Sequence, residues 1–259
     1  MNERIGDVLS DFEDIISRAQ VLTFLPRDSD LQENSVNELK DYIKRLNFAQ
    51  ELAVKNKDED MANKILAVRC GCRAIRSELD MWLSLKSEEW IESWGSLVDA
   101  QDFLRSAQSA HKMMRKPNIQ NMQDKYRWVE KFVFPPQTYL SPGFVVKKFV
   151  CSICGEDYEK CDHIEGLPYW GKFCNRIIAD IEKVQEISVV EEPKDKGCRI
   201  IHFTTEEGLV RNKMTWKTYD PEEIQNFPEF ETGEKIFTGI VMKPNGTYGR
   251  TQKMQEKRG

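Results

Sequence analysis

Apolar residues in the first 116 positions recur at intervals of three and four, the spacing that gathers side chains on one side of an α-helix. One series runs through Leu39, Tyr42, Leu46, Ala49 and Ala53, and a more regular one through Met61, Ile65, Val68, Cys72, Ile75, Leu79 and Trp82. Two long helices need such seams to pack along each other. A shorter series predicts an amphipathic helix within residues 1–19.

Polar residues and prolines predict where these helices begin and end. Ser35, with Glu38 three residues later, matches a capping box at the start of the second helix. A turn is expected near Lys57–Glu59, and a third helix from about Ser87 to a stop before Pro117. Residues 1–116 are therefore predicted to form an antiparallel helical bundle or a long helical hairpin.

The pattern changes at residue 117. Residues 117–150 are rich in proline and aromatic side chains, which indicates a connector ending in a strand over 144–150. A short helix is predicted over Lys172–Lys183. Strands are predicted over 186–190, 198–203, 209–219 and 235–242.

The predicted fold class is α+β, with the helical bundle followed by a zinc-knuckle domain that carries a small antiparallel sheet. This second domain spans 151–249 and includes a hairpin turn at Pro244-Asn245-Gly246. Residues 250–259 are polar and basic, and a flexible tail is expected there.

Composition narrows the class of protein. Of 259 residues, 40% are hydrophobic and 31% are charged, which is typical of a soluble globular chain. The net charge of −5 provides no overall attraction for a polyanion. No stretch reaches the roughly 20 apolar residues of a membrane span, and the first residues lack a signal-peptide pattern. We therefore expect a cytoplasmic protein without a membrane partner.

The chain has seven cysteines, and four of them fall within the 24 residues CSICGEDYEKCDHIEGLPYWGKFC. Cys151 and Cys154 form a C-x-x-C pair followed by Gly155, a residue suited to the tight turn of a zinc knuckle. Cys161 and His163 follow as a C-x-H step. Thiolates and imidazoles are the ligands that zinc prefers.

Five residues thus compete for four positions around one zinc ion. The favoured set is Cys151, Cys154, Cys161 and His163, and the rival set replaces Cys161 or His163 with Cys174. Four protein ligands leave no open position, so the zinc is predicted to be structural rather than catalytic. The alternative is that these are incidental buried cysteines, as expected for Cys72 on the helical seam.

The string C-x-x-C-x3-Y-x2-C-D-H-I-x-G-x2-Y-x-G-x2-C, followed by EISVVEEP, resembles a short zinc knuckle of bacteriophage and prophage proteins. There it precedes a strand in head-assembly and maturation-protease-like proteins. The resemblance covers residues 144–200. It implies zinc ligands among Cys151, Cys154, Cys161, His163 and Cys174 and an origin in a phage or mobile element, including phage defence. It implies no protease chemistry here.

Three classes of function remain. The favoured one is a non-enzymatic interaction or scaffold protein, in which the N-terminal helices bind a protein partner or a second copy. The second is nucleic-acid binding by basic and aromatic residues interleaved along one predicted strand, namely Arg211, Lys213, Trp216 and Lys217.

The third class is a protease-like enzyme or a metal-dependent nuclease. No catalytic residue can be named for it, because the sequence has no nucleophile elbow and no phosphate-binding glycine loop. Apart from His163, its only candidate bases are His111 and His202. Acidic pairs such as Glu88/Glu89, Glu191/Glu192 and Glu222/Glu223 are more typical of a solvated surface.

Overall fold

The computed structural model of the protein describes residues 5–220, which divide into two compact units. The first combines the chain up to Phe134 with Phe149–Arg176, and the second combines Pro135–Lys148 with the chain from Ile177 onward. The predicted strand at 235–242, the turn at 244–246 and the tail at 250–259 lie outside the described residues.

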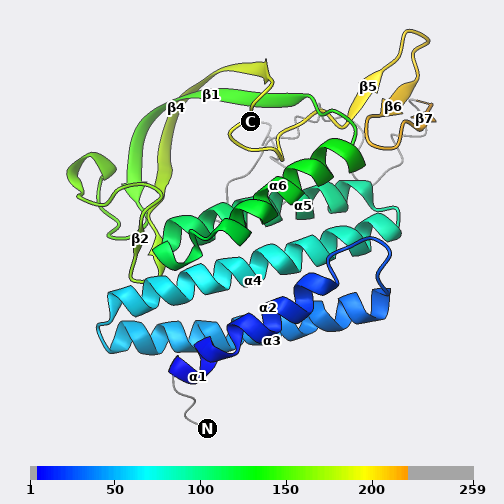
Figure 1. The fold of residues 1–259 in the computed structure, drawn as a ribbon. Helices are drawn as coiled ribbons and strands as arrows, with labels where there is room; N and C mark the ends of the chain where they lie inside the picture. The colour runs from blue at the N-terminus through cyan, green and yellow to red at the C-terminus, as the bar shows by residue number, and fades with distance from the viewer. Residues whose placement is uncertain (1–4, 221–259) are drawn as a thin grey trace. The chain divides into compact units, whose positions relative to one another are not determined.

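The first unit is built from helices that lie side by side (Figure 1). They are α1 (Ile5–Ser10), α2 (Phe12–Val21), α3 (Ser29–Lys55), α4 (Glu59–Lys86), α5 (Trp90–Ala110), the 3₁₀ turn η1 (Lys112–Met114) and α6 (Pro117–Val133). Helix α4 packs between α3 and α5. The short connections after α3 and α4 reverse the chain, so the predicted antiparallel bundle is confirmed.

Both predicted seams form the core of this bundle. Leu39, Leu46, Ile65 and Leu79 are fully buried, and so is Cys72, as expected for a core residue. The seam that could have received a partner is therefore filled by other helices of the same chain. Apolar side chains that do point outward from α3, such as Phe48 at 59% exposure, stand away from the seam.

Helix α3 begins before the predicted capping box. Asp28 is its N-cap, and its carboxylate accepts a hydrogen bond from the amide of Leu31. Ser35 is buried inside the helix, and Glu38 pairs with Arg18 on α2. The predicted capping box at Ser35 is therefore wrong, because Asp28 caps the helix almost two turns earlier.

The connector predicted over 117–150 is only partly confirmed: its closing strand over 144–150 lies within strand β1 (Tyr139–Cys151), but the start of the segment is helical. Its first half is helix α6, which begins at Pro117 and buries Ile119, Tyr126 and Val129. Proline suits the first helical position because its missing amide hydrogen would have no partner there. Pro117, which was predicted to end a helix, is therefore the first residue of the next helix.

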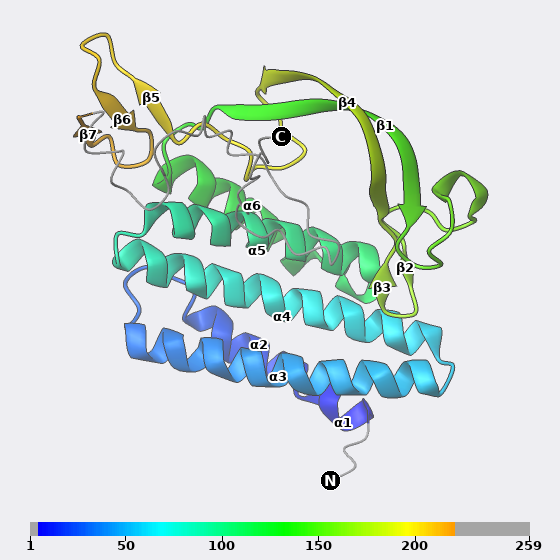
Figure 2. The same ribbon diagram turned by 180° about the vertical axis from the view of Figure 1, so that it is seen from behind.

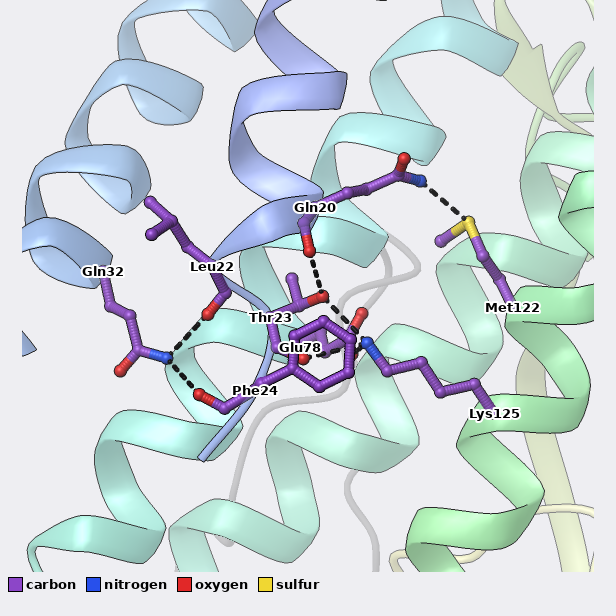
Figure 3. Close-up of polar contacts among 8 residues, drawn as sticks. All are labelled: Gln20, Leu22, Thr23, Phe24, Gln32, Glu78, Met122 and Lys125. Carbon is purple, nitrogen blue, oxygen red and sulfur yellow. Dashed lines mark hydrogen bonds and ion pairs between the residues drawn. The ribbon is translucent and has the colours of Figure 1, made fainter. Parts of the chain in front are cut away.

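A buried ion pair joins α4 to α6 (Figure 3). Nζ of Lys125 lies 2.6 Å from Oε1 of Glu78, whose residue is 1% exposed. Lys125 also donates to the carbonyl and hydroxyl oxygens of Thr23, and its ammonium lies 4.1 Å from the ring centroid of Phe24. One side chain therefore holds α4, α6 and the α2–α3 loop together.

The same loop is held from α3. Nε2 of Gln32, a fully buried residue, donates to the carbonyl oxygens of Leu22 and Phe24, as Figure 3 shows. These bonds satisfy backbone groups that the end of α2 leaves without helical partners.

The rest of the described chain contains the strands, joined by turns and loops. They are β1 (Tyr139–Cys151), β2 (Pro168–Tyr169), β3 (Lys172–Phe173), β4 (Arg176–Val190), β5 (His202–Thr204), β6 (Val210–Asn212) and β7 (Thr218–Tyr219), with a 3₁₀ turn η2 at Tyr158–Lys160. The predicted helix over Lys172–Lys183 is wrong, because this segment forms β3 and the first half of β4. Pairing with β1 supplies its backbone partners.

One small sheet lies in the second unit, and a two-stranded ribbon lies in it except for the end of β1 and the first residue of β4. Strands β1 and β4 pair as a long two-stranded ribbon, and β5, β6 and β7 form an antiparallel sheet with His202 opposite Asn212. The single strand predicted over 209–219 is therefore a hairpin of β6 and β7. The α+β class is confirmed. The described residues hold no helix long and apolar enough to cross a membrane.

Candidate metal centre

The first cysteine loop begins where β1 ends. The amide of Gly155 donates to the carbonyl oxygen of Cys151 at 2.9 Å, and the amide of Cys151 donates to that of Glu156 at 2.8 Å. Gly155 has a φ of +76°, a left-handed conformation that glycine adopts without strain. The amide of Ile153 points at Sγ of Cys151, 3.4 Å away. The loop thus turns both thiols of the C-x-x-C pair toward the same side.

The second loop carries Cys161 and His163. The amide of His163 donates to Sγ of Cys161 at 3.3 Å, which bends the chain around that sulfur. The imidazole ring packs edge-on against Tyr169, with 4.6 Å between ring centroids. The hydroxyl of Tyr169 in turn accepts from the amide of Ile164 at 3.0 Å. Strand β2 therefore orients the histidine.

The donor atoms of Cys151, Cys154, Cys161 and His163 all lie within 4.8 Å of one another. Nδ1 of His163 is 3.5 Å from Sγ of Cys161. A tetrahedral zinc with bonds of about 2.3 Å to sulfur and about 2.1 Å to nitrogen would separate these atoms by about 3.6 Å. The four residues could therefore hold one metal ion.

Cys174, the fifth candidate, lies beside this group. Its Sγ is 3.7 Å from Sγ of Cys151 and its side chain is fully buried. Two sulfurs that share a tetrahedral zinc would lie about 3.8 Å apart, whereas a disulfide needs about 2.0 Å. Backbone bonds bring Cys174 there: its amide donates to the carbonyl oxygen of Leu167 at 2.9 Å, and its own carbonyl oxygen accepts from the amide of Gly166 at 2.8 Å.

The thiols of Cys151, Cys161 and Cys174 differ in pKa. Burial alone would raise the pKa of the Cys151 thiol, but hydrogen bonds from the amides of Cys154 and Ile153 and from neighbouring thiols outweigh it, and the pKa falls to about 6. Burial and the nearby Cys151 raise the pKa of Cys161 to about 11 and that of Cys174 to about 12. A bound cation would favour the thiolate form of its ligands, so that metal binding releases protons.

The loop between Tyr169 and Lys172 docks the knuckle on the helices of the same unit; Figure 2 shows β2 and β3 beside α4. The amide of Gly171 donates to Oδ1 of Asn63 at 2.8 Å, and its carbonyl oxygen accepts from Nε2 of Gln50 at 3.0 Å. Sequence reasoning missed Gln50 and Asn63, because no local pattern connects residues more than 100 positions apart.

The four residues predicted to bind nucleic acid lie in the second unit. Arg211 is on β6, with its guanidinium carbon 5.9 Å from the ring centroid of Trp216, a side chain that is 58% exposed. Phe203, opposite Arg211 in the sheet, packs edge-on against Trp216 with 6.4 Å between ring centroids. Phe203 was missed, although its place on a predicted strand was a signal.

Lys213 and Lys217 differ in exposure and in their contacts. Lys217 is exposed, whereas the Lys213 ammonium donates to the hydroxyl of Thr138, and burial lowers its pKa. The structure therefore gives Lys213 a structural contact, leaves Trp216 and Lys217 exposed, and half-buries Arg211, whose Nε is removed from solvent.

The other residues considered for chemistry make local contacts or are exposed. Nδ1 of His111 accepts from the amide of Met113, and Nε2 of His202 lies 3.1 Å from the side-chain nitrogen of Asn212. Glu191 and Glu192 are exposed, and Glu222 and Glu223 lie outside the described residues. Within 5–220, the knuckle is the only group of three or more His, Cys, Asp or Glu residues gathered closely enough for a metal.

Comparisons of this chain with models of known families, with curated proteins and with solved structures found no match. The similarity to phage zinc knuckles stays a prediction from the residues quoted above.

Proposed function

We propose that Cys151, Cys154, Cys161 and His163 bind one structural zinc ion, and that the protein is a non-enzymatic interaction or scaffold protein. The observation that carries the metal assignment is the approach of four soft donors to within 4.8 Å of one another. Three sulfurs and one imidazole nitrogen suit zinc, and four protein ligands leave no position for a substrate or water. A structural role follows from that closed coordination.

The zinc would act as a clamp on the strands that enter and leave the knuckle. Strand β1 ends at Cys151 and β4 begins two residues after Cys174. Between them, the amide of Ser152 donates to the carbonyl oxygen of Asn175 at 3.0 Å. A closed metal site at this point fixes the register of the two strands, and a slip of one residue would exchange their faces.

The proposed setting is the cytoplasm, where reduced thiols remain available for metal binding. The similarity of the knuckle string supports an origin in a phage or mobile element. A protein partner or a second copy is the proposed binding partner. Since the helical seams are buried, contact through the N-terminal helices would use outward residues such as Phe48 and Val54, 59% and 39% exposed.

Metal analysis of the purified chain tests the proposal. We expect one zinc per chain, lost together with knuckle stability in Cys151→Ser, Cys154→Ser, Cys161→Ser and His163→Ala. Cys198→Ser is the matched control, because Cys198 is a buried cysteine of the second unit. A metal-free chain with an intact knuckle would contradict the proposal.

Cys174→Ser separates the two ligand sets. We expect it to keep zinc stoichiometry while weakening packing against Cys151. In the cobalt-substituted protein, the intensity of sulfur-to-cobalt charge transfer should match three thiolates. Loss of metal in Cys174→Ser together with retention in His163→Ala would favour the rival set and leave the structural role intact.

A second candidate function is single-stranded nucleic-acid binding, favoured by the grouping of Phe203, Arg211 and Trp216 on one exposed sheet. Exposed rings can stack on bases while arginine contacts phosphate. The knuckle itself is unsuited to this role, since residues 151–174 contain five acidic and two basic side chains.

Fluorescence anisotropy with a labelled oligonucleotide tests the second candidate. Binding should weaken steeply with salt as counterions are released, and Trp216→Ala should reduce affinity while Trp170→Ala, an exposed tryptophan of the knuckle, should not. Absence of binding at low salt would remove this candidate.

A further inference from the structure

One face of α4 carries three arginines and a single acidic residue. Arg69, Arg73, Arg76 and Asp80 follow one another at intervals of four, three and four residues, so their side chains lie on the same side of the helix. All four are half-buried. Helix α4 lies between α3 and α5, and Figure 2 shows the three helices side by side. The opposite side of α4 is covered, because Glu78 there pairs with α6. We call Arg69, Arg73 and Arg76 the arginine stripe.

The neighbouring helices orient two of these guanidinium groups. From α3, Oδ1 of Asn47 accepts a hydrogen bond from Nη1 of Arg69 at 2.8 Å. From α5, the ring of Phe103 supports Arg73, whose guanidinium carbon lies 5.5 Å from the ring centroid. The two side chains are therefore held in place before any ligand binds, which reduces the entropy lost on binding.

The positive charge of the arginine stripe is only partly neutralised. Within residues 5–220, the only carboxylate within 4.0 Å of these guanidinium groups is that of Asp80, whose Oδ2 lies 3.6 Å from Nε of Arg76. Nε of Arg69 and Nε of Arg76 are shielded from solvent and meet no hydrogen-bond acceptor in this part of the chain. Burial and the nearby charge of Arg73 lower the pKa of Arg69. Charged groups removed from water are ordinarily paired, so the stripe lacks an anion.

We propose that the arginine stripe binds the phosphate groups of a small anion such as a di- or triphosphate. A guanidinium group has five N–H donors in a planar fork that matches a phosphate, and Arg69 gives one of them to Asn47. Residues four apart on a helix are neighbours, so Arg69 and Arg73 can hold one phosphate between them while Arg76 reaches the next. This site goes beyond the function proposed above and does not depend on the metal.

The arginine stripe fits a short phosphate compound better than a long polyanion. From Arg69 to Arg76 it runs about 10 Å along the helix at 1.5 Å per residue, which is the length of a few linked phosphate groups. Beside it, α3 exposes carboxylates such as Asp41 and Glu51, and the chain has a net charge of −5. Both features disfavour an extended polyanion. Three positive charges also attract a multiply charged phosphate more strongly than a single carboxylate.

Isothermal titration calorimetry of the full-length, zinc-loaded protein with inorganic diphosphate tests the proposal. We expect saturable binding that weakens with salt. Arg69→Gln and Arg73→Gln should each reduce affinity about tenfold, the effect of losing one charge-assisted contact. Arg73→Lys keeps the charge but loses the fork, so it should recover only part of the affinity. Arg105→Gln is the matched control, because Arg105 is an exposed arginine of α5 that pairs with Asp102, and it should bind like the wild type.

Two results would overturn the inference. One is a wild-type chain that shows no saturable binding of diphosphate at low salt. The other is an affinity that stays unchanged in both glutamine variants, since diphosphate would then act elsewhere, for example by chelating zinc. Circular dichroism and zinc content of the same samples check that each variant keeps its helices and its metal. If a variant loses its helices, the wild type decides alone: diphosphate should raise its unfolding temperature more than chloride at equal ionic strength.

A labelled oligonucleotide distinguishes the two sources of phosphate. Binding that is lost in Arg73→Gln but kept in Trp216→Ala would support the arginine stripe and identify a nucleic-acid backbone as its source of phosphate. Binding of diphosphate alone would support it as a site for a free phosphate compound.

Discussion

Glu78 is a carboxylate almost wholly removed from water. Burial raises its pKa, and the nearby Lys125 ammonium opposes that rise only in part. Desolvating both members of such a pair costs free energy that their attraction does not always repay. The pair is therefore better explained by the specific joining of α4, α6 and the α2–α3 loop than by added stability.

The raised pKa predicts a pH dependence. A carboxyl whose pKa is higher in the folded protein keeps its proton there while the unfolded chain loses it, so folding is disfavoured as pH rises above the ordinary value of 4.5. Glu78→Gln removes that effect. The free energy of unfolding of the variant, relative to the wild type, should increase from pH 4.5 toward neutrality in urea denaturation series.

Glu33→Gln, which removes an exposed carboxylate from α3, is the control for loss of a charge alone. A difference between Glu78→Gln and wild type that stays constant with pH would show that burial does not perturb this carboxyl.

At the scale of elements, the β2–β3 hairpin joins the knuckle to the helices of its unit. Its turn residues Trp170 and Gly171 both have positive φ, 51° and 77°. A side chain at position 171 would also collide with Gln50, because a Cβ there would lie 2.6 Å from Nε2. This turn therefore requires glycine for its conformation and for its close approach to α3.

Gly171→Ala should destabilise the knuckle more than Gly166→Ala. Both positions are left-handed, so each alanine costs about 1–2 kcal/mol in strain, but a Cβ at Gly166 meets nothing within 4 Å. The collision with Gln50 should add about 1–3 kcal/mol at position 171. Amide hydrogen exchange across residues 149–176 measures the difference, and equal effects would contradict the docking contact.

At the scale of the whole molecule, the helices and the zinc-knuckle segment have different sources of stability. The helices of residues 5–134 share a large buried apolar core, whereas within 149–176 only Cys151, Gly171 and Cys174 are buried. A segment with so small a core needs another source of stability, and metal binding can provide it.

Removal of the metal by a chelator should therefore unfold the knuckle and leave the helices intact. We expect the helical circular dichroism signal to be largely retained, while amide exchange rises within 149–176 and falls again when zinc is restored. Cooperative loss of the helices on chelation would show that the bundle itself depends on the metal.

Periodicity carried the prediction of the bundle because helical hydrogen bonds are local, and the same spacing that forms the helix also collects its core. The seam residues from Leu39 to Leu79 are therefore buried in the core of the bundle, as their spacing predicted. The knuckle was predictable for a related reason: its five candidate ligands fall within 24 residues, so one pair of tight loops can gather them.

The errors fall where local signals compete with distant partners. Pro117 reads equally well as a stop or a start, and only the packing of Tyr126 and Val129 against the bundle selects α6. Residues 176–190 carry isoleucines at helix-compatible spacings, but their backbone groups bond to β1. In both cases tertiary contacts overrode propensity.

The sequence by itself determined the helical seams, the thiolate cluster and the α+β class, because each depends on residues close together in the chain. Only the tertiary structure decided that α6 and β4 form, that Gly171 meets Gln50 and Asn63, and that Phe203 lies beside Trp216. The physical reason is that these contacts join residues far apart in the chain, and no local preference of either partner specifies the other.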